Sequence, residues 1–185
     1  MSRVVDFIPF ADDTNIFFSH KDFNSLSETL NSEMCKLTQW CRANKLSINF
    51  KKNRILWFLG HTKGGKHLIY PFRLTTIYNI DCVKEAVFLG VILDEHLSWK
   101  HHILSVSRKI SKSIGTIYKS SFCLPKTPLR CLYYSLVYPY LIYCVSVWGS
   151  TYQSNLSRVF ILQKKIIRII SKVSFDSHTD VLFKE

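Results

Sequence analysis

The stretch "FIPFADDTNIFF", residues 7–18, places two adjacent aspartates between two arms rich in Phe and Ile. Strand-forming arms around Asp-containing turn residues predict a β-hairpin, with strands over 4–10 and 14–19 and a turn at 11–13. Two carboxylates at a hairpin tip repel each other unless a cation neutralises them. The stretch leaves two alternatives open: a tip that binds a hard divalent metal, or turn residues that serve only the backbone geometry.

After the hairpin, the periodicity of apolar residues predicts helices over about 22–43, 98–120 and 154–172. A left-handed stop is predicted at Asn44 for the first of them. Its apolar stripe, interpreted as core packing, consists of Phe23, Leu26, Leu30, Met34, Leu37, Trp40 and Cys41.

Short strand-like runs occur between the first two helices, at 46–50, 54–58, 72–78 and 86–93. The Gly-rich stretch between the second and third runs lacks phosphate-loop spacing and is interpreted as a plain turn. Strands therefore dominate the first half of the chain and helices the second, with a composition boundary near residue 96.

A further uncharged, Tyr-rich segment, "LYYSLVYPYLIYCVSVW" at 132–148, lies within a predicted helix from Pro128 to Gly149. Pro139 predicts a kink in that helix. Its seventeen residues are short for a membrane span and include five tyrosines. We interpret the segment as a buried helix, with a transmembrane helix as the alternative.

Charge is distributed unevenly along the 185 residues, whose net charge is +12. Residues 1–95 carry twelve Lys/Arg and ten Asp/Glu, whereas residues 96–175 carry twelve Lys/Arg and no acid. A surface without acids favours polyanionic partners, since Lys and Arg gain free energy by releasing counterions from phosphates. The alternative is a basic surface that faces only solvent.

The six cysteines form no Cys-x-x-Cys pair, so neither a zinc site nor a disulfide framework is predicted. The N-terminus has no apolar run long enough for a signal peptide. We therefore expect an intracellular protein, in the nucleus or cytoplasm and not secreted.

Several motifs follow one another in a recognisable order. They are "FADD" at 10–13, the helix and strand of 30–58, "VFLGVILDEHLSW" at 87–99, the Tyr-rich segment, and "LQKKIIRIIS" at 162–171. Together they resemble the reverse transcriptases of animal non-long-terminal-repeat, or LINE-type, retrotransposons, particularly the jockey-like group. The resemblance covers nearly the whole chain from Phe10 onward.

The resemblance implies an α/β fold of the α+β type. Residues 1–95 would be a partial polymerase palm with the catalytic hairpin, and 96–185 a helical thumb and connection. The implied function is RNA-directed DNA synthesis by a two-metal carboxylate mechanism with Mg²⁺, or Mn²⁺ as the alternative. The implied partners are an RNA template, a DNA primer and dNTPs, and no membrane is expected.

The resemblance also implies roles for individual residues. Asp12 and Asp13 would be catalytic and bind metal, and Lys52 would protonate the departing pyrophosphate, with a solvated lysine as the alternative. Asn53 replaces a common Thr, and Phe10 a commoner Tyr. The primer grip would be formed by Phe88, Leu89 and Gly90. The charge pattern, and not the resemblance, gives the nucleic-acid contacts: the polar sides of the acid-free helices carry Arg108, Lys109, Lys112, Lys164, Lys165 and Arg168.

One carboxylate that the resemblance requires is missing. Polymerases of this type complete the metal site with an Asp from an earlier strand, and the only acid here before Asp12 is Asp6. In an extended strand Asp6 would lie roughly 20 Å from Asp12, too far to share a metal. We therefore expect a C-terminal fragment of a polymerase that is inactive alone. The alternatives are a non-catalytic, basic nucleic-acid-binding remnant and a membrane-associated basic protein.

Overall fold

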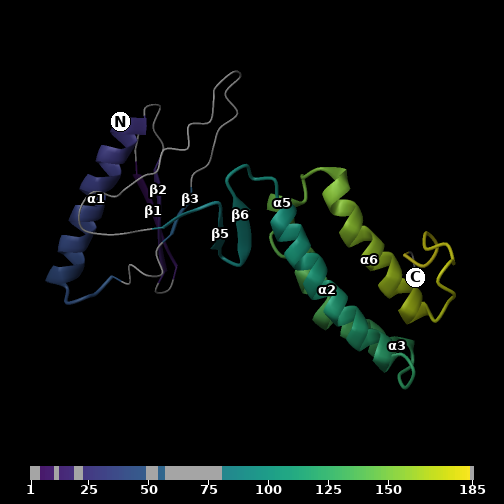
Figure 1. The fold of residues 1–185 in the computed structure, drawn as a ribbon. Helices are drawn as coiled ribbons and strands as arrows, with labels where there is room; N and C mark the ends of the chain where they lie inside the picture. Colours follow the sequence, from purple (N-terminus) through teal and green to yellow (C-terminus); the bar gives the residue numbers. More distant parts are fainter. Residues whose placement is uncertain (1–4, 11–12, 19–22, 49–53, 57–80, 184–185) are drawn as a thin grey trace. The chain divides into compact units, whose positions relative to one another are not determined.

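The chain is a mixed α/β protein that is mostly helical (Figure 1). The computed structural model describes residues 5–10, 13–18, 23–48, 54–56 and 81–183. These residues divide into two compact units, one that ends at Val83 and one that begins at Lys84. The border between the units therefore lies on the N-terminal side of the composition boundary near residue 96. Each unit is described by itself.

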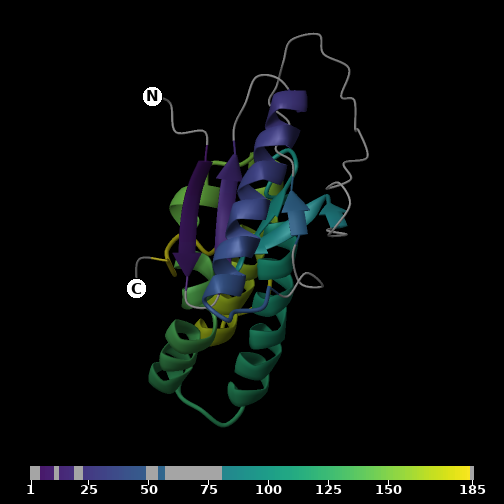
Figure 2. The ribbon, with the colours of Figure 1, turned by 90° about the vertical axis from the view of Figure 1, so that its left-hand side faces the viewer.

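The first unit begins with the predicted hairpin, which is confirmed. Strands β1 (Val5–Phe10) and β2 (Asp13–Phe18) pair antiparallel, and the pair Phe10 and Asp13 closes the ladder. Asp13 is therefore the first strand residue and not a turn residue. Figure 2 shows the two strands side by side, with helix α1 (Phe23–Ala43) alongside.

Helix α1 confirms the helix predicted over 22–43. Leu30, Met34 and Thr38 are buried at four-residue spacing, which makes them one face of the helix. Trp40 was predicted to belong to this face but is 58% exposed. It follows Met34 by six residues, which at 3.6 residues per turn places it about 120° away around the axis. The left-handed residue after the helix is Lys45, with φ 56°, and not Asn44.

The remaining strands form two more two-stranded sheets. In the first unit, β3 (Arg54–Leu56) pairs parallel with β4 (Asp81–Val83). In the second, β5 (Glu85–Phe88) and β6 (Val91–Asp94) form an antiparallel hairpin.

Of the predicted strand runs, one is wrong, a second has no strand conformation where it is described, and a third cannot be compared with the structure. The prediction of one strand over 86–93 was wrong, because the chain reverses at Leu89 and Gly90. Residues 46–48 of another predicted run have no strand conformation. The run at 72–78 lies outside the described residues.

Helices dominate the second unit. The predicted long helices are confirmed as α2 (Lys100–Ser120) and α6 (Gln153–Ser171), which lie side by side (Figures 1 and 2). Between them run α3 (Lys126–Leu136), α4 (Tyr138–Ile142) and α5 (Val145–Trp148). The buried core consists of Ile103, Val106, Ile110, Ile114, Ile117, Leu129, Val137, Leu141, Trp148, Val159 and Ile166.

The prediction of one kinked helix from Pro128 to Gly149 was wrong, because the segment forms three helices. Pro139 has no N–H to donate, and Val137 just before α4 leaves the helical region at φ −120°. Cys144 is left-handed, at φ 52°, and separates α4 from α5.

The prediction that the Tyr-rich segment is buried was also wrong. The exposed tyrosines are Tyr134, Tyr138, Tyr140 and Tyr143, and Tyr133 is half-buried. Helices α3 and α4, with Val137 between them, instead bury Leu129, Val137 and Leu141. Among the described helices, none is long and apolar enough to cross a membrane.

Candidate nucleic-acid interface

The predicted primer-grip residues Phe88, Leu89 and Gly90 lie at the tip of the β5–β6 hairpin. Phe88 pairs with Val91, which leaves Leu89 and Gly90 as a two-residue turn. Both have positive φ, 46° and 80°, as a type I′ turn requires. A glycine adopts this conformation without steric cost, whereas Leu89 does so under strain. The strained turn therefore needs support from elsewhere in the unit.

Tyr143 provides that support from the Tyr-rich segment. Its hydroxyl donates a hydrogen bond of 2.5 Å to the carbonyl oxygen of Leu89. A Cβ built on Gly90 would lie 3.6 Å from the Tyr143 ring, so the ring packs against the turn. Trp148 donates from Nε1 to the Tyr143 carbonyl oxygen at 2.8 Å and thereby fixes the backbone that carries the tyrosine. The tip thus rests on the loop between α4 and α5.

Asp94 connects the base of the same hairpin to α2. Its carboxylate, only 7% exposed, accepts backbone N–H bonds from His96, Ser98 and Trp99 at 3.0–3.2 Å and one from the Ser98 hydroxyl at 3.2 Å. Burial alone would raise the pKa of Asp94, but the hydrogen bonds from Ser98, His96 and Trp99 outweigh burial and lower the pKa below its usual value. Asp94 therefore holds the loop into α2 in its ionised form.

The loop into α2 is also tied to α6 and to the hairpin. Thr151 and Asn155, at the start of α6, donate from Oγ1 and Nδ2 to the Ser98 carbonyl oxygen at 3.0 and 3.3 Å. His102 on α2 accepts from the Ile92 N–H of β6 at 3.3 Å through Nδ1. Burial, and secondarily the charge of Lys109, lower the pKa of His102, so the ring is neutral at pH 7. Hairpin, α2 and α6 thus form one connected framework.

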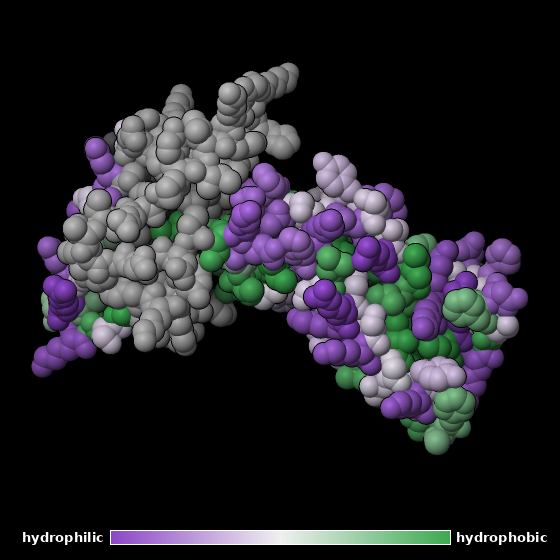
Figure 3. Space-filling model, in the orientation of Figure 1, coloured by the Kyte–Doolittle hydropathy of each residue, from purple (hydrophilic) through white to green (hydrophobic). Residues whose placement is uncertain are grey.

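The six predicted nucleic-acid contacts lie on α2 and α6 of this framework. Arg108, Lys109, Lys112 and Lys165 are exposed, and Lys164 and Arg168 are half-buried. Three of the six approach aromatic rings: Lys109 lies 5.5 Å from the Tyr140 centroid, Lys164 lies 4.6 Å from that of Phe160, and Arg168 lies 5.7 Å from that of Phe175. On the face of this unit in Figure 3, apolar side chains are exposed among hydrophilic ones. The basic surface is therefore interleaved with aromatic groups.

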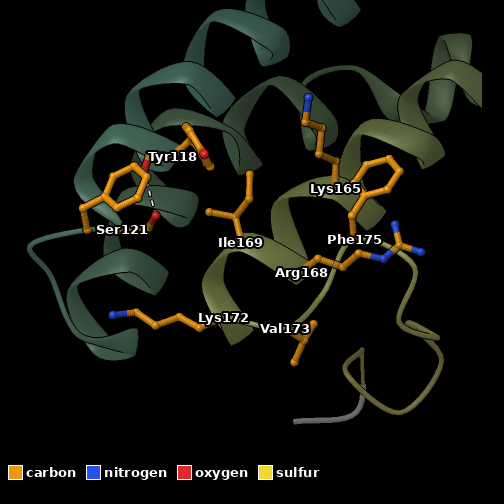
Figure 4. Close-up of a pocket in the computed structure, with 9 residues that line it drawn as sticks. Tyr118, Ser121, Lys165, Arg168, Ile169, Lys172, Val173 and Phe175 are labelled. Carbon is orange, nitrogen blue, oxygen red and sulfur yellow. Dashed lines mark hydrogen bonds between the residues drawn. The ribbon is translucent and has the colours of Figure 1, made fainter.

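The structure does not bring all six cations to one place. Lys165 and Arg168 line a pocket of about 370 Å³ between the C-terminal ends of α2 and α6 (Figure 4). Arg108, Lys109 and Lys112 do not line it. At 1.5 Å per residue, Lys109 lies about 13 Å along α2 from Tyr118, a pocket residue. The complete lining is Tyr118, Ser121, Phe122, Lys165, Arg168, Ile169, Lys172, Val173 and Phe175.

The sequence prediction missed the aromatic half of this pocket. Tyr118, Phe122 and Phe175 follow or end apolar periodic segments, where aromatic residues are usually assigned to the core. Phe122 and Phe175 lie beyond the last residues of α2 and α6, Ser120 and Ser171, and this placement was the available sign that they face outward.

The predicted catalytic residues fall largely outside the described part of the chain. Asp12 and Lys52 lie outside it, and Asp13 is described only as the first backbone position of β2. Within the described residues, no group of three or more His, Cys, Asp or Glu could hold a metal ion. The catalytic and metal-binding roles therefore stay predictions.

Comparison with known proteins finds relatives along most of the chain. Over 167 residues it is 25% identical to the probable RNA-directed DNA polymerase from transposon BS of Drosophila melanogaster. Over 165 residues it is 26% identical to the RNA-directed DNA polymerase from mobile element jockey of the same species. Both matches cover 88% of this chain and 18% of the relative.

A third relative, the jockey polymerase of Drosophila funebris, is 31% identical over 90 residues, which cover 47% of this chain and 10% of the relative. No family model and no solved structure matches. The chain is therefore a distant homologue of jockey-like retrotransposon reverse transcriptases, as its motifs predicted, and it spans about 18% of the length of the curated relatives it matches over most of its own.

Proposed function

We propose that this chain is the palm-hairpin and thumb part of a retrotransposon RNA-directed DNA polymerase, and that its helical unit binds the template–primer duplex. The observation that carries the proposal is the exclusion of acids: residues 96–175, which include α2 to α6, have twelve Lys/Arg and no Asp or Glu. A surface that follows two phosphate backbones gains from each cation and loses from each acid. Such contacts position a duplex without reading its sequence.

The β5–β6 tip is the proposed primer grip within this unit. Tyr143 holds the exposed turn of Leu89 and Gly90 at the tip, and Asp94 holds the base of the hairpin. A turn fixed in this way can support a primer strand without a conformational change on binding, which lowers the entropic cost of positioning.

For the hairpin of the first unit we propose the catalytic role that the homology suggests, with Asp12 and Asp13 as metal-binding carboxylates and Lys52 near the leaving group. Mg²⁺ bound there would activate a primer hydroxyl and stabilise the leaving pyrophosphate. Among the described residues, no group of three or more His, Cys, Asp or Glu could hold a metal ion by itself. We therefore propose that these 185 residues bind template–primer but do not extend it alone.

Binding is tested with the full chain and a fluorescently labelled DNA/RNA hybrid of about 20 base pairs. The variant Lys164→Gln, Lys165→Gln, Arg168→Gln should bind more weakly than the wild type. The matched control Arg42→Gln, Lys45→Gln, Lys84→Gln removes the same charge from exposed positions outside residues 96–175 and should bind almost normally. Equal binding by all three proteins contradicts the proposed surface. Flotation with anionic vesicles but no binding to the hybrid favours the membrane alternative.

Catalysis is tested by primer extension with Mg²⁺ or Mn²⁺, comparing the chain with its Asp12→Asn variant. No incorporation is expected from either protein. If the wild type incorporates nucleotides and Asp12→Asn does not, the 185 residues can polymerise alone. Another residue of the chain would then replace the Asp that related polymerases supply from an earlier strand.

A further inference from the structure

The pocket between the ends of α2 and α6 combines aromatic rings with cations. Three aromatic rings, those of Tyr118, Phe122 and Phe175, line it together with three cations, and no acid is among its nine lining residues. Figure 4 shows Tyr118 and Ser121 on the α2 side, with the α6 residues and Phe175 across from them. Its volume of about 370 Å³ lies within the range of pockets that hold one small ligand.

The aromatic rings are poorly covered by the protein itself. Phe122 is 73% exposed and Phe175 is 77% exposed, and Tyr118 is also exposed. Tyr118 and Phe122 pack edge to face with centroids 5.2 Å apart, so each supports the other while part of its surface stays in water. An exposed pair of this kind loses water-accessible apolar surface as soon as a flat ring stacks on it.

The cations are not equivalent. Arg168 donates from Nε to the Ser177 carbonyl oxygen at 2.9 Å and lies over Phe175, so its guanidinium is already held by the protein. The pKa of Asp176 is lowered mainly by the hydrogen bond that its carboxylate accepts from Ser174, and the charge of Arg168 lowers it further. Lys165 and Lys172 are exposed at the rim. They are the cations best placed to meet an anionic group.

We infer that this pocket binds an unpaired nucleotide of a single-stranded nucleic acid, with its base against Phe122 and Phe175 and its phosphates at Lys165 and Lys172. Base stacking on aromatic rings beside a positively charged groove is the usual chemistry of single-strand binding. Inside a duplex the base faces are covered by neighbouring base pairs, so a duplex can offer these rings only its terminal pair. An acidic peptide would satisfy the lysines but would leave the rings exposed.

The inference deepens the proposed function, on which it rests: the helical unit would hold the duplex along its basic helices and an unpaired strand at the far ends of α2 and α6. Duplex binding and single-strand binding can be tested separately, because duplex binding does not require the pocket aromatics.

The test uses the full chain and fluorescence anisotropy with a 12-nucleotide single-stranded RNA, the same sequence as single-stranded DNA, and the corresponding blunt hybrid. Phe122→Ala and Phe175→Ala should each weaken binding of the single strands about 5- to 150-fold. Binding of the hybrid should change less than twofold. Tyr152→Ala, an exposed aromatic at the opposite end of α6, is the matched control and should have no effect.

The charge contacts are tested by Lys165→Gln and Lys172→Gln, with Lys100→Gln at the N-terminal end of α2 as control. Each pocket variant should flatten the salt dependence of single-strand binding by about 0.7 in the log–log slope. Photocrosslinking with 4-thiouridine in the RNA should place the crosslinked peptides at 118–122 and 173–175. Because the substituted rings are exposed, the variants should keep the wild-type circular dichroism spectrum, and a variant that loses it is replaced by its Leu counterpart.

Three results overturn the inference. Wild-type single-strand affinity in both Phe variants, or an equal loss for strand and hybrid, shows that the pocket is not a single-strand site while leaving duplex binding intact as a proposal. A polyglutamate peptide whose binding is lost in Phe122→Ala to the same degree shows that the occupant is an acidic protein segment. Absence of binding to all three nucleic acids contradicts the proposed function and the inference together.

Discussion

Replacing the buried Asp94 by Ala should strongly destabilise the helical unit. The substitution removes the acceptor for three backbone N–H groups and one hydroxyl in the loop between β6 and α2. Hydrogen bonds to a charged group contribute about 1.5–3 kcal/mol, and donors left without an acceptor add to the cost. We expect a loss of about 3 kcal/mol in the free energy of unfolding.

A loss of this size is easy to measure. For a unit of roughly 100 residues, 1 kcal/mol shifts Tm by about 4–8 °C, so Asp94→Ala should lower Tm by roughly 12–24 °C. Thermal unfolding followed by circular dichroism at 222 nm reports mainly on the helical unit. Asp180→Ala, at an exposed aspartate of the same unit, is the control and should shift Tm by no more than about 4 °C. Equal Tm values for the two variants would show that the Asp94 hydrogen bonds do not hold the loop.

The same contact predicts a pH dependence with a definite sign. Because the pKa of Asp94 is lower in the folded chain than the ordinary 3.8, its ionised form stabilises the fold at all pH values above 3.8. That contribution is lost as the pH falls below 3.8 through the folded pKa. The Tm difference between wild type and Asp94→Ala should be constant from pH 5 to 7 and shrink below pH 3.8. A difference that grows on acidification would contradict this assignment.

Further predictions concern the β5–β6 tip and α2. Tyr143→Phe removes the hydroxyl that donates to Leu89 and should lower the free energy of unfolding, measured in urea, by about 0.5–1.5 kcal/mol. The control Tyr140→Phe keeps the ring under Lys109 and should leave it unchanged. Equal effects of the two variants would argue against the Tyr143 contact. Gly90→Ala should cost about 1–2 kcal/mol, because φ 80° strains an L-residue although its Cβ would only touch the Tyr143 ring. Gly115→Ala, in open space on α2, should instead stabilise by about 0.5–1 kcal/mol, and the same sign for both glycine variants would refute the conformational argument.

The regular elements could be predicted because their physics is local. The hairpin β1–β2 follows from strand-forming arms around Asp residues, and α1, α2 and α6 follow from apolar residues at three- and four-residue spacing. The break at Val137 was predictable only as a kink, since proline constrains its neighbours without fixing how the chain continues. The hairpin within 86–93 was missed because Leu89 takes a left-handed conformation that leucine rarely adopts.

The candidate site was predictable in its charges but not in its geometry. Lys165 and Arg168 were selected by the absence of acids, which is a property of composition. Their aromatic neighbours Tyr118 and Phe122 come from α2, and only the packing of α2 against α6 brings the two groups together. Likewise, Tyr143 could not be assigned to Leu89 from the sequence, because contacts between distant segments depend on the tertiary fold.

The salt dependence of binding to a DNA/RNA hybrid tests the central claim, that the acid-free helical unit grips phosphate backbones. We predict a steep log–log slope for the wild type and a slope smaller by about 2–3 for Lys164→Gln, Lys165→Gln, Arg168→Gln, since each lost phosphate contact removes roughly 0.9. Arg42→Gln, Lys45→Gln, Lys84→Gln should keep a slope within about one unit of the wild type. Identical slopes for the two triple variants would contradict the claim, because net charge alone, and not this surface, would then account for binding.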